Sequence, residues 1–271
     1  MFDLLGFVKR LRSDFYFTKW RMAKLSLHIY IWPRRKNSGS ELFASAWNFM
    51  IRYWSRLMTE TDHRTVWQWG GREETFLEIY GLIKKYKPDI VVPVTLNISP
   101  NLSRAMQEER GGLLAVPHPF LNASFACALE KIGIVSYSIT IDPMRLRDSG
   151  VMMGMKTTPS ALPKNNSTLI RARSRVEAEE FVVNAVDYLL NGSGTAQTEL
   201  FISPNFFQFA RVLKCNLYFG LTHVSETGIL YVTIEKSHSH SDQGILEEFT
   251  AFLAKHRKVF RNWEMRREVL T

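Results

Sequence analysis

The stretch Gly111–Phe120, which reads GGLLAVPHPF, decides the fold of this 271-residue chain. Leu113 to Val116 form an uninterrupted apolar run, bounded by two glycines on one side and by Pro117 on the other. Such a run is typical of a strand buried on both faces of a parallel sheet. His118 follows this predicted strand by two residues.

The residues that follow predict a strand–helix–strand unit. Small and apolar residues from Leu121 to Lys131 indicate a helix that ends at Gly133. Ile134 to Ile141 indicate a second strand. His118 therefore lies at a turn from strand to helix, and in open α/β sheets ligands bind beyond the carboxyl ends of the strands.

The remaining sequence predicts more elements of both kinds. Strands are expected at residues 90–92, 195–202, 215–221 and 229–235, and helices within 41–86 and at 99–110, 181–190, 206–213 and 246–269. Residues 33–40 and 142–166 read as loops. We predict an α/β protein, a single domain whose central, mostly parallel sheet is flanked by helices, with an N-terminal amphipathic helical extension. Residues 1–60 are expected to form basic, aromatic membrane-facing helices, and residues 61–271 the α/β domain.

Positive charge is concentrated at the N-terminus. The formal net charge is +9, and residues 1–36 alone hold nine Lys or Arg against Asp3 and Asp14, which gives +7. Eight aromatic residues are interleaved with these cations. Four apolar residues recur there at helical spacing: Phe2, Leu5, Val8 and Leu11. The pattern favours an anionic membrane surface as partner and no nucleic acid; packing of this helix on its own domain is the alternative.

Cysteine content and hydropathy indicate a compartment. Two cysteines, Cys127 and Cys215, give no framework of disulfides, which favours a reducing environment. No run approaches the roughly 18 apolar residues of a membrane span. Lys9 and Arg10 interrupt the N-terminal apolar residues before a signal peptide could form. We expect a cytoplasmic protein, peripheral on the inner face of the cell membrane.

Familiar catalytic and cofactor motifs are missing from the sequence. It contains no G-x-x-x-x-G-K-[ST], H-E-x-x-H, G-x-S-x-G or C-x-x-C pattern. His238 and His240 lie close to Asp242, but a solvated polar loop is the better interpretation of that segment than a metal site. No metal and no cofactor are expected.

Five segments resemble, in their order and texture, the bacterial lipid A biosynthesis (late) acyltransferases, within the lysophospholipid acyltransferase-like fold. They are GGLLAVPHPFLNAS, DPMRLRDSG, VDYLLNGSGTAQTEL, PNFFQFARVLKCNLYFGL and FRNWEMRRE, and the resemblance covers roughly residues 60–268. The family has a histidine followed five positions later by a carboxylate, H-x-x-x-x-D/E. This chain has His118 but carries Ala123 at the acidic position.

The resemblance implies an enzyme of lipid or specialised metabolism that uses an acyl carrier protein or coenzyme A thioester as co-substrate. His118 would be the general base that activates a hydroxyl or amine acceptor. Glu199 would supply the missing acid, because it lies at the end of a predicted strand where the family has a second acidic position. Asp142 and Asn122 remain alternative orienting groups.

Arginines are the residues that the resemblance implies for the carrier's phosphates. Arg147 belongs to a segment that partly matches the family's arginine segment, and Arg171 is the other candidate. The alternative function is a non-catalytic lipid- or carrier-binding member of the same fold, which has lost its chemistry together with the acid.

Overall fold

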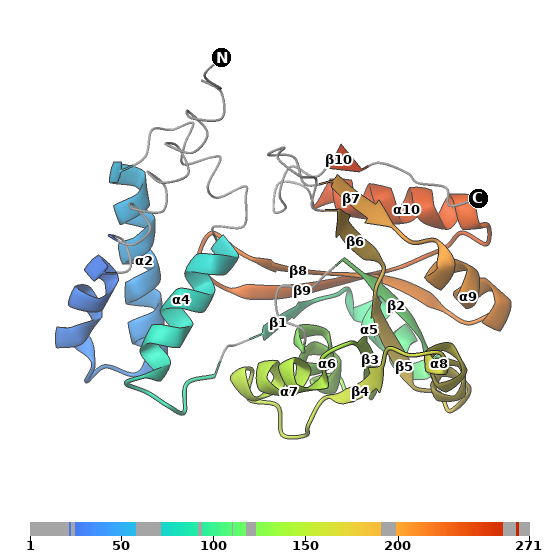
Figure 1. The fold of residues 1–271 in the computed structure, drawn as a ribbon, viewed down its shortest axis with the longest axis horizontal. Helices are drawn as coiled ribbons and strands as arrows, with labels where there is room; N and C mark the ends of the chain where they lie inside the picture. The colour runs from blue at the N-terminus through green and yellow to red at the C-terminus, as the bar shows by residue number, and fades with distance from the viewer. Residues whose placement is uncertain are drawn as a thin grey trace, which may run out of the picture. The chain divides into compact units, whose positions relative to one another are not determined.

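The computed structural model describes residues 22, 25–57, 72–91, 94–109, 111–117, 123–190, 199–256 and 264–265 (Figure 1). His118 and Asn122 are therefore outside the described residues, as is the predicted helix at residues 2–11. The chain divides into two compact units, Met1–Ile90 and Val91–Thr271. Each unit is described by itself.

The first unit is helical in its described part. Its elements are a helical segment at residues 25–31, η1 (Trp32–Arg34), α2 (Gly39–Leu57) and α4 (Arg72–Lys84). The start of α2 is set by a capping box, because the Ser38 N–H donates to Glu41 Oε2 at 3.0 Å and the Glu41 N–H donates to Ser38 Oγ at 3.3 Å.

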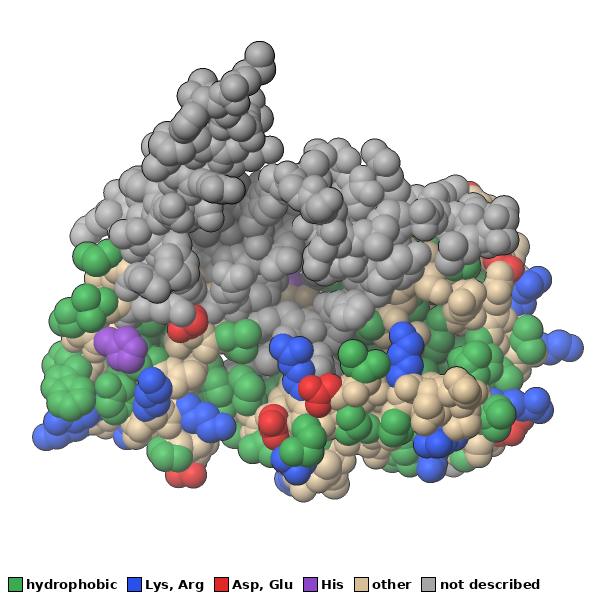
Figure 2. Space-filling model, viewed as in Figure 1, with side chains coloured by type: hydrophobic (Ala, Val, Ile, Leu, Met, Phe, Trp, Pro, Cys, Tyr) green, Lys and Arg blue, Asp and Glu red, His purple; other side chains and the backbone are tan. Residues whose placement is uncertain are grey.

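In Figure 2, hydrophobic side chains gather over the helical segment that precedes α2, with Lys and Arg side chains beside them.

Aromatic and aliphatic side chains form the core of the first unit, as the helical spacing predicts. Trp47 on α2 is 1% exposed and packs edge-on against Phe76 of α4, with ring centroids 6.4 Å apart. The other fully buried apolar side chains described in this core are Leu27, Ile31, Leu42, Ala46, Met50, Ile79 and Ile83.

The second unit is built on a sheet that, among the described residues, contains seven strands in the order β1-β9-β8-β2-β5-β3-β4. Its strands are β1 (Val94–Asn97), β2 (Gly112–Val116), β3 (Ser136–Thr140), β4 (Ser160–Pro163), β5 (Phe181–Ala185), β8 (Leu217–Val224) and β9 (Leu230–Lys236). β8, β2, β5, β3 and β4 run parallel, β9 is antiparallel to β8, and β1 is parallel to β9. A smaller sheet of order β10-β7-β6 comprises β6 (Asp187–Leu190), β7 (Glu199–Ile202) and β10 (Glu264–Met265). The predicted α/β class and its mostly parallel sheet are confirmed.

Helices cover both faces of the main sheet (Figure 1). They are α5 (Pro100–Glu108), α6 (Ser124–Glu130), α7 (Pro143–Met152), α8 (Thr168–Glu177), α9 (Asn205–Leu213) and α10 (Asp242–Lys255). α8, α9 and α10 share one core with every second residue of the central strands, for example Leu113 of β2 and Phe219 of β8. The intervening residues, such as Leu114, face α6 instead. All five residues of β2 are buried, as predicted for a strand covered on both faces.

Gly220 allows α6 to approach this sheet closely. A Cβ atom at position 220 would lie 2.5 Å from Phe125 Cε1 of α6 and 3.0 Å from Val116 Cγ1 of β2. Gly133 has φ +75° and ends the turn after α6, as the sequence predicts.

The predicted helix at residues 181–190 is wrong, because these residues form β5 and β6. Val182 pairs with Leu113 and Val183 with Leu114 in the middle of the sheet. A short apolar run fits a buried strand and a buried helix equally well, and the β-branched valines favour the strand once neighbours exist on both sides.

The predicted loop at residues 142–166 is also wrong, since it contains α7 and β4. The Asp142 side chain caps α7 by accepting from the Arg145 N–H at 3.0 Å, and Pro143 occupies the first turn. α8 was not predicted.

The strand expected at residues 90–92 is wrong, because Ile90 and Val91 belong to no strand and β1 begins at Val94. Two helix predictions are confirmed with shifted boundaries. Ser99 caps α5 by accepting from the Leu102 N–H, and Pro100 begins that helix. The predicted helix at 246–269 is correct for α10, but β10 lies within its last third. Among the described residues, no helix has the length and apolarity needed to cross a membrane.

Candidate functional site

The carboxyl end of β2 is the best candidate for a functional site, because two neighbouring strands send their connections to opposite faces of the sheet there. β2 leads into α6, which packs on the face that contains Leu114. β5, its neighbour, leads through β6 and β7 into α9, whose Phe207 packs on the opposite face with Leu113. In open α/β sheets, ligands bind beyond the strand ends at such a reversal.

The described residues at this strand end are closely connected. The Val186 N–H donates to the Val116 carbonyl oxygen at 2.9 Å, and the Ser203 N–H donates to the Val186 carbonyl oxygen at 2.7 Å. Pro117 is buried. These bonds hold the exit of β5 and the end of β7 against the end of β2. His118 is the second residue after β2 in the sequence.

Ala123, five positions after His118 in the sequence, begins the described chain again at the start of α6. It is fully buried, and its N–H donates to Ser149 Oγ of α7 at 3.1 Å. The adjacent Ser124 hydroxyl is also fully buried and makes no hydrogen bond to any described residue. Two hydroxyl groups therefore lie close to Ala123.

Sequence reasoning missed Ser149 and Ser124. The available signal was the segment Arg147–Gly150, which partly matches the family and contains Ser149. Ser149 of this segment accepts a hydrogen bond from Ala123, which follows the segment that contains His118 in the sequence.

Glu199 is the first residue of β7, and not the end of a strand as predicted. β2 has β5 and β8 as its neighbours, whereas β7 pairs with β6 and β10 in the smaller sheet. Glu199 is opposite Leu190, three residues along the hairpin from the Ile202–Asp187 pair that adjoins the main sheet. Three residues of strand correspond to about 10 Å. β7 is therefore not a neighbour of β2 in the sheet, and the catalytic role of Glu199 stays a prediction.

Asp142 lies at the end of β3, and β5 separates β3 from β2. Two strand spacings amount to about 9–10 Å. Its carboxylate caps α7, so this alternative orienting group already has a structural role.

The two predicted carrier-binding arginines lie on helices that cover opposite faces of the sheet. Arg147 is exposed on α7 and forms an ion pair with its neighbour Asp148 at 3.4 Å. Arg171 is exposed on α8, whose buried Ala172 belongs to the core on the α9 face. The structure does not bring these two side chains together.

No metal site is formed by the described residues. His238 and His240 are exposed, and no group of three or more His, Cys, Asp or Glu side chains in this part of the chain could hold an ion. The segment is instead held by Glu248, which accepts from Ser237 Oγ at 2.6 Å and from the His238 N–H at 3.0 Å. Burial alone would raise the pKa of Glu248, but these hydrogen bonds and one from the Ser239 N–H outweigh burial and lower the pKa.

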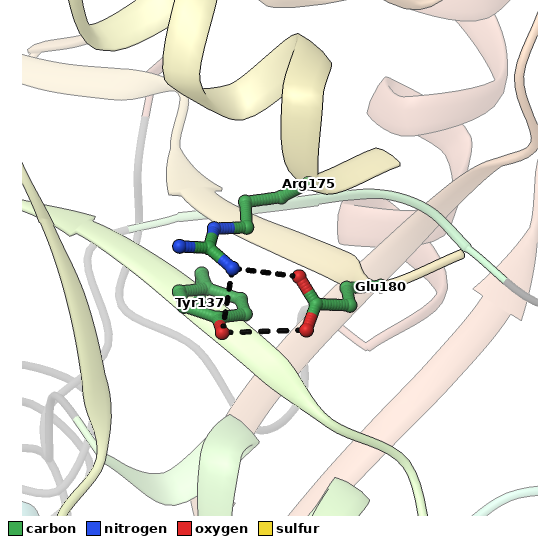
Figure 3. A network of polar contacts seen from close by, with 3 residues as sticks. All are labelled: Tyr137, Arg175 and Glu180. Carbon is green, nitrogen blue, oxygen red and sulfur yellow. Dashed lines mark hydrogen bonds and ion pairs between the residues drawn. The ribbon is translucent and has the colours of Figure 1, made fainter. Parts of the chain in front are cut away.

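Polar networks occupy the opposite, amino edge of the sheet. Arg175 Nη1 at the end of α8 donates to the Tyr137 hydroxyl at 3.1 Å and to Glu180 Oε2 at 3.3 Å (Figure 3). The Tyr137 hydroxyl donates to Glu180 Oε1 at 3.3 Å, and the guanidinium lies over the tyrosine ring at 4.3 Å. Tyr137 is the second residue of β3 and Glu180 precedes β5, so this network ties α8 to the starts of two strands.

A second network has the same location. Glu109 Oε2, just after α5, accepts from Lys236 Nζ at 2.5 Å and from the buried Tyr218 hydroxyl at 3.2 Å. The hydrogen bond from Lys236 lowers the pKa of Glu109. Burial raises the pKa of Tyr218, so this phenol stays protonated and donates. Both networks stabilise the amino edge of the sheet. At the carboxyl edge, the strands continue into the segments that connect them to the next elements.

No protein-family model matches the chain, and no curated protein matches it.

Proposed function

We propose that the chain is an acyltransferase that moves an acyl group from a thioester of acyl carrier protein or coenzyme A to a hydroxyl or amine. The reaction would take place at the carboxyl end of β2. The carrying observation is the reversal of connections between β2 and β5, together with a histidine two residues after β2 in the sequence.

The chemistry that this proposal assigns to His118 is general base catalysis. The imidazole removes the proton from the acceptor oxygen or nitrogen, which attacks the thioester carbonyl carbon. The carbon–sulfur bond then breaks, and the thiolate leaves and takes the proton back from the imidazolium. Acyl group, proton and electron pair all balance without a further cofactor.

An imidazole needs a partner that fixes its orientation. Glu199 remains our first proposal for this partner, with Asn122 and Asp142 as alternatives. The hydroxyl groups of Ser149 and Ser124 are further polar groups near Ala123. A hydroxyl can orient an imidazole but does not stabilise its charge as a carboxylate does, which predicts a slower base.

We place the reaction in the cytoplasm. Both cysteines are free, Cys127 is buried and Cys215 is half-buried. Free thiols are the normal state of cysteine in a reducing compartment.

The experiment is intact-mass detection of acyl transfer from a panel of acyl carrier protein and coenzyme A thioesters to candidate acceptors. His118→Ala is expected to lower kcat/KM by about 10²–10⁴, the usual contribution of a general base. His240→Ala is the matched control, since His240 is exposed in a distant loop of the sequence, and it should leave the rate unchanged. Glu199→Gln, Asp142→Asn and Asn122→Ala identify the partner by which one of them lowers kcat.

Ala123→Asp tests the family geometry directly. If His118 acts as in the family, a carboxylate at position 123 should raise kcat of the parent enzyme. Carrier binding without turnover in every donor and acceptor combination, in both the parent and Ala123→Asp, would replace the transferase by the non-catalytic binder.

A further inference from the structure

One helical segment of the first unit has apolar residues on two opposite sides. Leu27 and Ile31 are 2% and 0% exposed and belong to the core of the unit. Four other apolar side chains are exposed: Met22 at 52%, Leu25 at 56%, Ile29 at 67% and Trp32 at 57%. Leu25 and Ile29 are four residues apart and share one side of the helical segment at residues 25–31, and Met22 and Trp32 continue the helical spacing in the sequence, three residues before Leu25 and three after Ile29. Single exposed apolar residues are ordinary, but an aligned set of four indicates a contact surface.

Cations are held at the carboxyl end of this set. The Arg35 guanidinium lies over the Trp32 ring at 4.3 Å, and its Nη1 donates to the Trp32 carbonyl oxygen at 3.1 Å. The Arg34 guanidinium lies over the Tyr30 ring at 3.9 Å and donates to the Tyr30 carbonyl oxygen at 2.8 Å. Lys36 follows and is exposed.

The charge of this part of the sequence has one sign. Between Asp14 and Glu41 there is no acidic residue. The same interval contains six cations, which are Lys19, Arg21, Lys24, Arg34, Arg35 and Lys36. A second copy of the chain would bring the same positive charge, so the partner that fits is anionic.

Apolar side chains distinguish between anionic partners. Met22, Leu25 and Ile29 are flexible aliphatic groups, which enter the acyl region of a bilayer but offer no ring for a nucleic-acid base to stack on. Tryptophan with adjacent cations suits the headgroup level, where anionic phosphates lie.

We propose that Met22, Leu25, Ile29 and Trp32, with Arg34, Arg35 and Lys36, form a docking stripe that binds the surface of an anionic lipid bilayer. The aliphatic side chains enter the acyl boundary, and the three cations contact the lipid phosphates. This inference goes beyond the proposed reaction and does not depend on it, because it concerns binding in the absence of any acyl donor.

The test is co-sedimentation of the full chain with vesicles of phosphatidylcholine containing 30% phosphatidylglycerol, compared with phosphatidylcholine alone. The wild-type chain should bind the anionic vesicles. Ile29→Glu should weaken binding by about tenfold or more, because it removes an aliphatic side chain that the bilayer would bury and adds a negative charge. Val212→Glu is the matched control: Val212 is 74% exposed on α9, and its replacement should leave binding unchanged.

The cations are tested by a second pair of variants. Replacing Arg34, Arg35 and Lys36 together by Gln should weaken binding on the order of a hundredfold, since each cation near an anionic surface contributes about fivefold. Replacing Lys84, Lys85 and Lys87 by Gln changes the net charge equally within the same unit. An equal loss in both triple variants would mean that net charge alone drives binding, and it would overturn the docking stripe.

Three other results would also overturn the proposal. The first is absence of wild-type binding to anionic vesicles. The second is a wild-type dimer in light scattering that Ile29→Glu converts to a monomer, because the stripe would then bind a second copy. The third is release of the bound chain from vesicles by duplex DNA or RNA at equal phosphate concentration. If Ile29→Glu changes the circular dichroism spectrum, Leu25→Glu takes its place in the same comparison.

Discussion

Gly220→Ala should destabilise the second unit, although replacing a glycine inside a strand normally has the opposite effect. The new Cβ atom would lie 2.5 Å from Phe125 Cε1, about 1 Å closer than ordinary van der Waals contact, and 3.1 Å from Leu114 Cδ1. Phe125 is 1% exposed and Leu114 is fully buried, so neither side chain has free space to move into. Relief requires either a shift of α6 away from the sheet or an unfavourable rotamer of the phenylalanine.

Two effects of opposite sign decide the magnitude. Alanine restricts the unfolded chain more than glycine, which stabilises by about 0.5–1 kcal/mol. Overpacking of a filled core costs about 1–3 kcal/mol. We therefore expect a net loss of about 1–2 kcal/mol, and at a urea dependence of about 2 kcal/mol per M the midpoint should fall by about 0.5–1 M.

The assay is equilibrium urea unfolding of the single and double variants. Phe125→Leu removes the atom that the new methyl group meets, so it should cost less stability in the Gly220→Ala background than in the wild type. A higher urea midpoint for Gly220→Ala, or no coupling between the two positions, would refute the close approach of α6 to β8. It would also refute the placement of the start of α6, where Ala123 lies in the candidate site.

Two further predictions concern titratable groups. Lys236 lowers the pKa of Glu109 from its ordinary 4.5, so the stability from this pair is fully present above that value and is lost as the pH falls through the lowered pKa. Glu109→Gln should therefore lower the melting temperature at pH 7 but not at pH 2, and a constant difference would contradict the pair. Burial raises the pKa of both thiols, that of Cys215 to about 11, so iodoacetamide at pH 8 should modify Cys127 and Cys215 much more slowly in the native chain than in urea. Equally fast labelling of both states would contradict their burial.

Local sequence patterns were sufficient to predict the elements whose ends are set by residues close to them in the sequence. The strand β2 is delimited by glycines and a proline, and α5 by its Ser99 cap and Pro100, and both were predicted close to their observed bounds. The βαβ unit followed from the change of periodicity after His118. These signals act within a few residues and do not depend on the rest of the fold.

Elements that depend on distant partners were not predictable in the same way. Phe181–Leu190 has the hydrophobicity of either a helix or a strand. The choice for Phe181–Ala185 was made by β2 and β3, which lie on the two sides of β5 in the sheet. α7 was obscured by glycine, serine and methionine residues, although Asp142 and Pro143 are good signals for a helix start. In both cases the missing information was which segments pack together.

The predicted acid of the candidate site also depends on which segments pack together, and here an error would affect the proposed chemistry. Glu199 was assigned by its order in the sequence, but the order of strands in a sheet follows from pairing, and β7 pairs outside the main sheet. The presence of an alanine at position 123 has a physical explanation. The side chain is fully buried, and the Ala123 N–H donates to Ser149 Oγ. A carboxylate there would lose its hydration and would stay ionised only beside a cation or several hydrogen-bond donors. The hydroxyls of Ser149 and Ser124 are such donors, and an imidazolium would be such a cation, so we expect Ala123→Asp to be most stable if His118 lies within reach of the new carboxylate.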